Sequence, residues 1–220
     1  MEDPKSIFEK VFQLYDKLPV CGKPRDDEYT VLAAVVAETG AGIKVVALTS
    51  GTKCIGPDCL NEKGCLLSDS HGEVLARRSF VRYLSDWIIT IIENPTAASA
   101  DDCPIQWNTD IEQSNFIAVK DSWKFSLYIS DSPCGDASFY ASDLIEANGL
   151  NQTGAKLVPS TETASGEKLG RLRTKSGRSD IKVENRTTSM SCSDKVCRWI
   201  CLGLQGYAPL TNYFVLIYFL

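Results

Sequence analysis

The sequence predicts an α/β protein in which helices pack on a sheet. Segments with helical spacing alternate with apolar, partly β-branched runs in the order helix, hairpin, helix, strand, helix, insertion, helix. The composition, 44% hydrophobic and 23% charged, is that of an ordinary soluble domain. The length of 220 residues suits one large domain or two small ones. These values exclude a disordered tail, a collagen-like repeat and a disulfide-stapled mini-protein.

The N-terminal part predicts one helix followed by a β-hairpin. Residues 7–18 place seven apolar side chains at helical spacing, and Pro19 ends the pattern. Residues 30–37 and 43–50 are apolar runs separated by a glycine-containing turn, which is typical of two antiparallel strands.

The middle of the chain predicts a long helix, a strand and a further helix start. Asp69 and Ser70 are both good helix-capping residues, and they precede a helical pattern from about 74 to 92. Residues 123–130 alternate like a strand. We expect another helix to begin near 131–135.

The C-terminal part contains a long polar segment and a local excess of positive charge. Residues 148–188 are rich in Gly, Ser, Thr and charge without a core period, so we interpret them as an insertion or surface loop system. Residues 189–206 return to an ordered, helical pattern. Residues 167–198 hold nine Lys/Arg and four Asp/Glu, a net +5 in a chain whose total is −5. A basic patch on an acidic body favours a phosphate-bearing partner.

The cysteines and the termini predict a protein of the cytoplasm and/or nucleus. Nine cysteines, an odd number in a chain too long to need stapling, are expected to be thiols or metal ligands. The N-terminus shows no apolar signal segment. The longest apolar run, 213–220, is far shorter than the roughly 20 residues that cross a membrane. We expect no membrane span, and the negative net charge argues against a DNA partner.

The most informative residues are His71, Glu73 and Cys134. Zinc-dependent nucleobase deaminases place a His-x-Glu motif at one helix start and a Pro-Cys motif at another. Imidazole and thiolates hold a zinc ion that lowers the pKa of water, and a carboxylate that is not a ligand can then carry the proton. Both motifs also occur by chance, but His71 is the only histidine in the chain.

The third metal ligand is not fixed by spacing alone. The usual deaminase signature has a second cysteine three residues after the first, and Ala137 stands at that position. The candidates elsewhere are Cys192, Cys197 and Cys201.

Three segments together resemble the adenosine deaminases that act on RNA. Residues 68–78, 132–137 and 189–199 are similar to the three metal-binding segments of that family. The absence of double-stranded-RNA-binding domains and the run 173–180 point to the tRNA branch. Over about residues 10–206 the chain resembles the editase-type tRNA-specific deaminases, which convert the adenosine 3′ of the anticodon, in alanine tRNA, to inosine.

The resemblance implies a catalytic centre and a fold. His71, Cys134 and Cys192 would bind zinc, and Glu73 would move protons. The implied fold is the cytidine-deaminase-like three-layer fold, a mixed sheet with helices on both faces, incomplete at the C-terminus. The deaminase domain would cover 1–206, followed by a divergent apolar tail, 207–220.

The resemblance also implies two sets of basic contacts. Family members bury an inositol hexakisphosphate, and the matching positions here are Arg77, Arg78, Lys195, Arg198 and Trp199. The basic stretch implies tRNA contacts by Arg173, Lys175 and Arg178. Cys197 and Cys201 then need no role beyond packing.

Four functional hypotheses follow. The first is zinc-dependent hydrolytic deamination of adenosine to inosine in tRNA. The second is a truncated, catalytically inactive product that retains zinc or tRNA binding, because family domains continue beyond the third segment. The third is a deaminase of free nucleosides or cytidine, against which the insertion and the basic patch argue. A purely structural zinc protein ranks last, because such sites normally have a fourth protein ligand.

Overall fold

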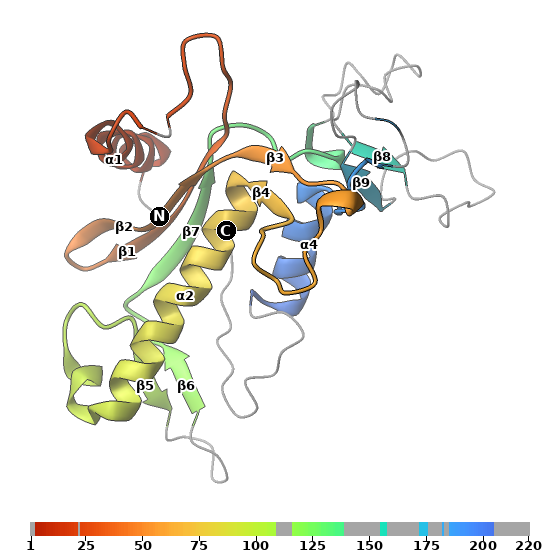
Figure 1. The fold of residues 1–220 in the computed structure, drawn as a ribbon. Coiled ribbons are helices and arrows are strands. Elements are labelled where there is room, and N and C mark those ends of the chain that lie inside the picture. Colours follow the sequence, from red (N-terminus) through yellow and green to blue (C-terminus); the bar gives the residue numbers. More distant parts are fainter. Residues whose placement is uncertain are drawn as a thin grey trace.

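The computed structural model describes residues 3–21, 23–108, 116–138, 155–157, 172–175, 182 and 185–204. These residues form a mixed α/β structure with antiparallel sheets, drawn in Figure 1. The helices and strands are, in order, α1 (Pro4–Lys17), β1 (Leu32–Thr39), β2 (Gly42–Ser50), β3 (Thr52–Cys54), β4 (Asp69–His71), α2 (Gly72–Glu93), β5 (Ile105–Asn108), β6 (Phe116–Val119), β7 (Lys124–Ile129), β8 (Ala155–Leu157), β9 (Arg173–Lys175) and α4 (Cys192–Leu202). Short 3₁₀ turns lie at Pro57–Cys59, Pro95–Ser99 and Asp136–Ser138.

The central sheet has the strand order β2-β1-β7, with both pairs antiparallel. The predicted hairpin is confirmed: β1 and β2 pair from Leu32 opposite Ser50 to Thr39 opposite Gly42. The predicted strand at 123–130 is β7, which pairs with the other edge of β1. Because β1 lies between two partners, its residues from Leu32 to Ala37 are all buried.

The two faces of β1 pack against different helices. Successive side chains of a strand point to opposite faces of its sheet. Ala33 and Val35 belong to the larger hydrophobic cluster, which contains Phe80 of α2, whereas Ala34 and Val36 pack with Val11 of α1. The helices α1 and α2 therefore cover opposite faces of the sheet, and both were predicted from helical spacing (Figure 1).

The start of α2 differs from the sequence-based expectation. Asp69 and Ser70, expected to cap the helix, lie instead in β4, which pairs with β3. His71 is the N-cap residue and makes no side-chain capping bond. Asp69 does not cap because its carboxylate contacts the backbone N–H of His71 and two lysines, which are described below.

Other expectations are also corrected or fall outside the described residues. The sheet was expected to be mixed, but every strand pairing among the described residues is antiparallel. The segment expected to be a surface insertion contains the paired strands β8 and β9, and backbone bonds join Lys175 to Ser189 and Arg173 to Ser191. The helix expected near 131–135 is represented by the 3₁₀ turn at Asp136–Ser138. The tail 207–220 lies outside the described residues.

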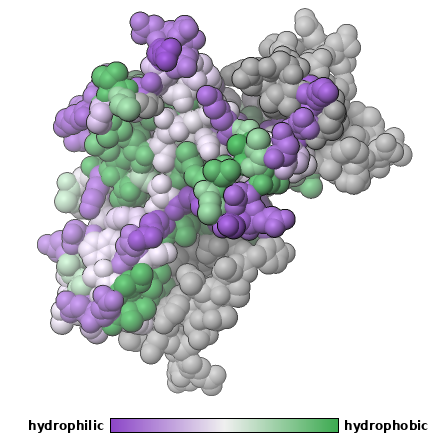
Figure 2. Space-filling view, in the orientation of Figure 1, coloured by the Kyte–Doolittle hydropathy of each residue, from purple (hydrophilic) through white to green (hydrophobic). Residues whose placement is uncertain are grey.

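The visible surface mixes hydrophilic and hydrophobic residues (Figure 2). Exposed apolar side chains include Leu60, Leu66 and Leu67 in the segment between β3 and β4. Within the described part of the chain, no helix is both long enough and apolar enough to span a membrane.

Candidate metal centre

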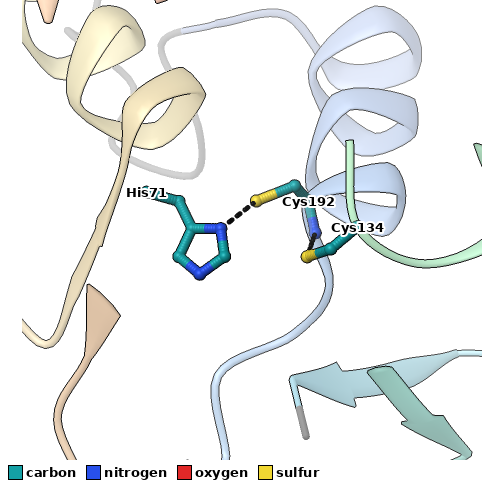
Figure 3. Close-up of side chains that lie close together, drawn as sticks. All are labelled: His71, Cys134 and Cys192. Atoms are coloured by element: carbon teal, nitrogen blue, oxygen red, sulfur yellow. Dashed lines mark hydrogen bonds between the residues drawn. The ribbon is translucent and has the colours of Figure 1, made fainter. Parts of the chain in front are cut away.

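Three side chains that are far apart in the sequence converge at one point. His71 ends β4, Cys134 lies in the segment after β7, and Cys192 begins α4 (Figure 3). One ligand atom of each residue lies within 4.8 Å of the others. The Cys192 sulfur is 3.5 Å from Nδ1 of His71, and the Cys192 backbone N–H donates to the Cys134 sulfur at 3.4 Å.

The structure selects Cys192 from the three cysteines that the sequence left open. Cys192 is fully buried beside His71, whereas Cys197 and Cys201 are exposed on α4. The expectation that these two cysteines serve in packing is therefore wrong. Both cysteines lie further along α4 than Cys192, on the face of the helix that is exposed to solvent.

Local structure fixes the segment that carries Cys134 against the start of α4. Gly135 has φ +109°, and a Cβ there would lie 2.5 Å from the Ser191 hydroxyl oxygen, so only glycine fits. The Ser193 backbone N–H donates to the Cys134 carbonyl at 3.0 Å, and its hydroxyl donates to the Pro133 carbonyl. Ser191 caps α4 by accepting from the Asp194 backbone N–H.

The two thiols are electrostatically coupled. The hydrogen bond from Cys192 lowers the pKa of Cys134 to about 4, against the effect of burial. The same contact and burial raise the pKa of Cys192. A cation bound between the two sulfurs would favour the thiolate form of both.

A buried ion network lies directly behind Cys192. The Lys175 ammonium donates to the Asp69 carboxylate at 2.9 Å and to the Cys192 sulfur at 3.0 Å. Lys195 donates to the other oxygen of Asp69 and to the Ser189 hydroxyl. The side chains of Lys175 and Asp69 are only 3% and 6% exposed. Burial would raise the pKa of Asp69, but the bonds from Lys195 and Lys175 outweigh it and hold the pKa below its usual range.

The predicted RNA contacts by Arg173 and Lys175 are corrected by this network. Both residues lie in β9 with almost no exposed surface, 1% for Arg173 and 4% for Lys175. The Arg173 Nε donates to the Asp136 carboxylate, and its backbone N–H donates to Asp194. These side chains hold β9 to neighbouring segments and do not reach a surface where phosphates could bind. Arg178 lies outside the described residues.

Sequence reasoning missed the part that Asp69 and Lys175 play. Asp69 was interpreted as a helix cap, and Lys175 as part of a solvated basic stretch. The burial of Lys175 could have been found from the alternation of residues along a strand. Arg173 and Lys175 are two residues apart, so they share one face of β9 and are buried, whereas Thr174 between them is not.

Glu73 completes the centre as a buried carboxylate. It lies in the first turn of α2, is 2% exposed, and its Oε2 has no hydrogen-bond partner among the described residues. A buried carboxylate without a partner is costly unless a proton or a ligand satisfies it. One imidazole and two cysteine sulfurs are a typical donor set for zinc with an open position. The residues present therefore fit a zinc ion and a water-derived ligand.

A second cluster of possible ligands is less suitable. Cys54, Asp69 and His71 also place ligand atoms within 4.8 Å of one another. The Asp69 carboxylate of this cluster is already bonded to two lysines, which makes it less available as a metal ligand. The cluster of His71, Cys134 and Cys192 is therefore the stronger candidate for a metal site.

The residues expected to bind an inositol phosphate form a separate basic group. Arg77 is half-buried over the ring of Trp199, 5.4 Å from its centre, and donates to the Leu204 carbonyl. Its Nε is buried without a hydrogen-bond partner among the described residues. Burial and the charges of Arg78 and Arg198 lower the pKa of Arg77. Lys195, which was also expected to bind the inositol phosphate, bonds to Asp69 instead.

Comparison with known proteins identifies relatives of this chain. The adenosine-deaminase (editase) domain family matches residues 47–218, more than half of the chain. The chain is 34% identical to tRNA-specific adenosine deaminase 1 of Drosophila melanogaster, over 92% of this chain and 50% of that protein. It is 30% identical to the double-stranded RNA-specific adenosine deaminase of Mus musculus, over 86% of this chain and 16% of that protein. It is 28% identical to the mouse tRNA-specific adenosine deaminase 1, over 86% of this chain and 58% of that protein.

Two facts about coverage accompany these matches. The chain spans half of the Drosophila relative and a smaller share of the double-stranded RNA-specific one. The family match runs to residue 218 and so includes most of segment 207–220, which we expected to be unlike the family.

Replacing Asp69 by asparagine should destabilise the protein strongly. The Asp69→Asn variant leaves two lysine ammonium groups without their shared carboxylate, and breaking a buried pair costs about 3–5 kcal/mol. Urea unfolding at pH 7 measures the change. The folded protein lowers the pKa of Asp69 below its value in the unfolded chain, which is about 3.9. The stabilisation by Asp69 is therefore fully present at pH values above about 3.9 and is lost as the pH falls below that value.

The matched control is Asp86→Asn. Asp86 pairs with Arg82 at 2.8 Å on the exposed face of α2, where both side chains are more than half exposed. Its loss should change the free energy of unfolding by less than about 1 kcal/mol. Equal effects of the two substitutions would contradict a structural role for the buried network.

Proposed function

Because the chain belongs to the adenosine-deaminase (editase) domain family, we propose that it catalyses the zinc-dependent hydrolytic deamination of adenosine to inosine in tRNA. The observation that carries the proposal is the cluster of His71, Cys134 and Cys192 together with the buried Glu73, whose Oε2 has no hydrogen-bond partner among the described residues. The relatives from Drosophila and mouse that are named for tRNA favour tRNA as the RNA substrate.

The chemistry divides between a metal and the protein. A zinc ion held by His71, Cys134 and Cys192 would act as a Lewis acid that brings the pKa of water close to neutrality. Lys175 would hold Cys192 in place through its 3.0 Å contact with the sulfur, and Asp69 would balance the charge of that lysine.

Glu73 is the proposed proton carrier. Its carboxylate lies two residues after His71 but is not one of the clustered ligands. It would carry the first proton of the attacking water to the ring nitrogen and the second proton, from the C6 hydroxyl of the adduct, to the leaving amine. Water adds at C6 of the adenine, the C6–N bond breaks, and inosine and ammonia are the products.

A cavity near the start of α2 would hold part of the RNA substrate. Its volume is roughly 500 Å³, within the usual range for small-ligand sites, and its lining includes Thr52, Ser70, Lys53 and Glu28. Ser70 precedes His71 in the chain and Thr52 pairs with His71 across β3 and β4, although none of the three clustered ligands lines the cavity. The Lys53 ammonium suits a phosphate of the RNA backbone.

The family fold and a second cofactor also belong to the proposal. The placement of α1 and α2 on opposite faces of the central sheet supports a cytidine-deaminase-like three-layer arrangement. The half-buried Arg77, with an unpartnered Nε and two further arginines close by, supports binding of inositol hexakisphosphate against Trp199. An anion there would offset three positive charges.

Replacing Glu73 by glutamine should abolish deamination without removing the metal. Glutamine keeps the volume of the side chain but cannot accept the proton, so inosine formation on tRNA should fall by about 10²- to 10⁴-fold. Zinc content, measured by elemental analysis, should stay near one per chain. The control is Glu93→Gln at the exposed end of α2, which should deaminate normally. Normal activity in Glu73→Gln would overturn the mechanism.

Replacing Cys192 by alanine should eliminate zinc binding. The substitution removes one of three protein ligands, whereas Cys197→Ala removes an exposed thiol of the same helix. We expect about one zinc per chain in the unsubstituted protein and in Cys197→Ala, and almost none in Cys192→Ala. Equal zinc in both variants would exclude the proposed ligand set.

Inositol hexakisphosphate should raise the melting temperature of the protein through Arg77. A ligand that binds only the folded state stabilises it in proportion to the logarithm of its concentration. The shift should be lost in Arg77→Met, which removes the guanidinium but keeps a long side chain over Trp199. Arg82→Met, on the exposed face of the same helix, should retain it. Identical shifts in both variants would argue against an anion site at Arg77.

A further inference from the structure

Tyr29 is an exposed aromatic residue whose tip is fixed. The residue is 65% exposed and lies in the segment just before β1. Its hydroxyl donates to the carboxylate of Asp131, which lies 102 residues away in the sequence. Asp131 belongs to the short segment between β7 and Cys134. The bond therefore ties the N-terminal segment to the segment that carries a proposed metal ligand.

Tyr29 lies in the wall of the cavity near the start of α2. It lines this cavity together with Lys53 and with Thr52, which is paired with His71 across β3 and β4. The side chain is also within electrostatic reach of Glu73. Burial, the bond to Asp131 and the negative charges of Asp131 and Glu73 raise the pKa of Tyr29 to about 12, so the phenol stays neutral.

We propose that the Tyr29 ring is a stacking platform for an unpaired base that flanks the target adenosine in the RNA. The inference rests on the proposed function and adds a recognition residue to it. Aromatic rings at the edge of a binding site stack on the faces of single-stranded bases, and lysines near them bind the backbone. Tyr29 has an exposed ring, and Lys53 lines the same cavity.

The bond to Asp131 explains why this tyrosine is suited to stacking. A freely rotating exposed side chain loses conformational entropy when a base settles on it, and that loss weakens binding. Because Asp131 accepts from the hydroxyl, the ring is held before RNA arrives. A base inside a duplex is covered on both faces by its neighbours, so the platform favours bases in a loop.

The test measures binding separately from chemistry. The probe is an RNA stem-loop with a seven-nucleotide loop that contains the target adenosine, with 2-aminopurine at the 5′ or the 3′ neighbouring position. Stacking on an aromatic ring quenches this fluorophore. Titration of the zinc-loaded chain gives the dissociation constant and the quenching, and inosine formation is measured on the unlabelled stem-loop.

Three variants separate the ring from its hydroxyl and from the fold. Tyr29→Leu removes the ring and should weaken binding of the stem-loop by about 5- to 100-fold, with loss of quenching. Tyr29→Phe keeps the ring without the bond to Asp131 and should retain the quenching, with binding weaker than that of the unsubstituted chain but tighter than that of Tyr29→Leu. Phe8→Leu, which removes an exposed aromatic ring of α1 outside the cavity lining, should bind normally. Zinc content should be the same in all.

The outcomes distinguish the inference from the proposed function. One outcome is that the unsubstituted chain makes inosine, and that Tyr29→Leu binds the stem-loop and quenches 2-aminopurine as strongly as the unsubstituted chain. In that case the stacking role is wrong and the deaminase function stands. If the unsubstituted chain neither binds the stem-loop nor makes inosine, both are overturned. Weakened binding and lost quenching in Tyr29→Leu alone, together with inosine formation by the unsubstituted chain, supports both.

Discussion

The carboxylate of Asp69, buried between Lys175 and Lys195, is the interaction on which the rest of the centre depends. It joins β4, which ends in His71, to β9 and to α4, which begins at Cys192. Two of the three clustered side chains are thus placed by segments that meet at one acidic residue. Lys175 extends the contact to the Cys192 sulfur itself. The buried pair of Lys175 and Asp69 therefore helps to hold Cys192 in position.

The central sheet contributes a second constraint. β1 is enclosed by β2, β7 and helices on both faces, and its residues include Ala33, Ala34 and Ala37, which are fully buried. The small side chains of Ala33 and Ala37, on the face that α2 covers, let the helix lie close to the sheet. The start of α2, with His71 and Glu73, therefore lies beside the first residues of β1. The backbone confirms this closeness: the Gly72 N–H donates to Gly51, whose own N–H donates to Val31.

The clustered residues of the proposed centre could be predicted from the sequence, but the residues that support them could not. His71, Glu73 and Cys134 stand in short motifs whose chemistry is specific, and the resemblance to a family selected Cys192. Arg173 and Lys175 look like surface charges because a sequence shows charge without showing its partner. Their acids, Asp136 and Asp69, lie 37 and 106 residues away in the chain, so no local pattern connects them. The exposure of Cys197 and Cys201 was missed because the sequence does not show which face of α4 packs against the rest of the protein.

The sequence separation of the clustered residues has a consequence for folding. His71 and Cys192 are 121 residues apart, and Cys134 and Cys192 are 58 apart, so the ligand set closes two large loops of chain. Contacts of such range form late and slow the rate at which a chain folds. Metal uptake should accordingly report on completed folding of the whole domain. A bound ion would link the distant segments and slow the unfolding of the domain.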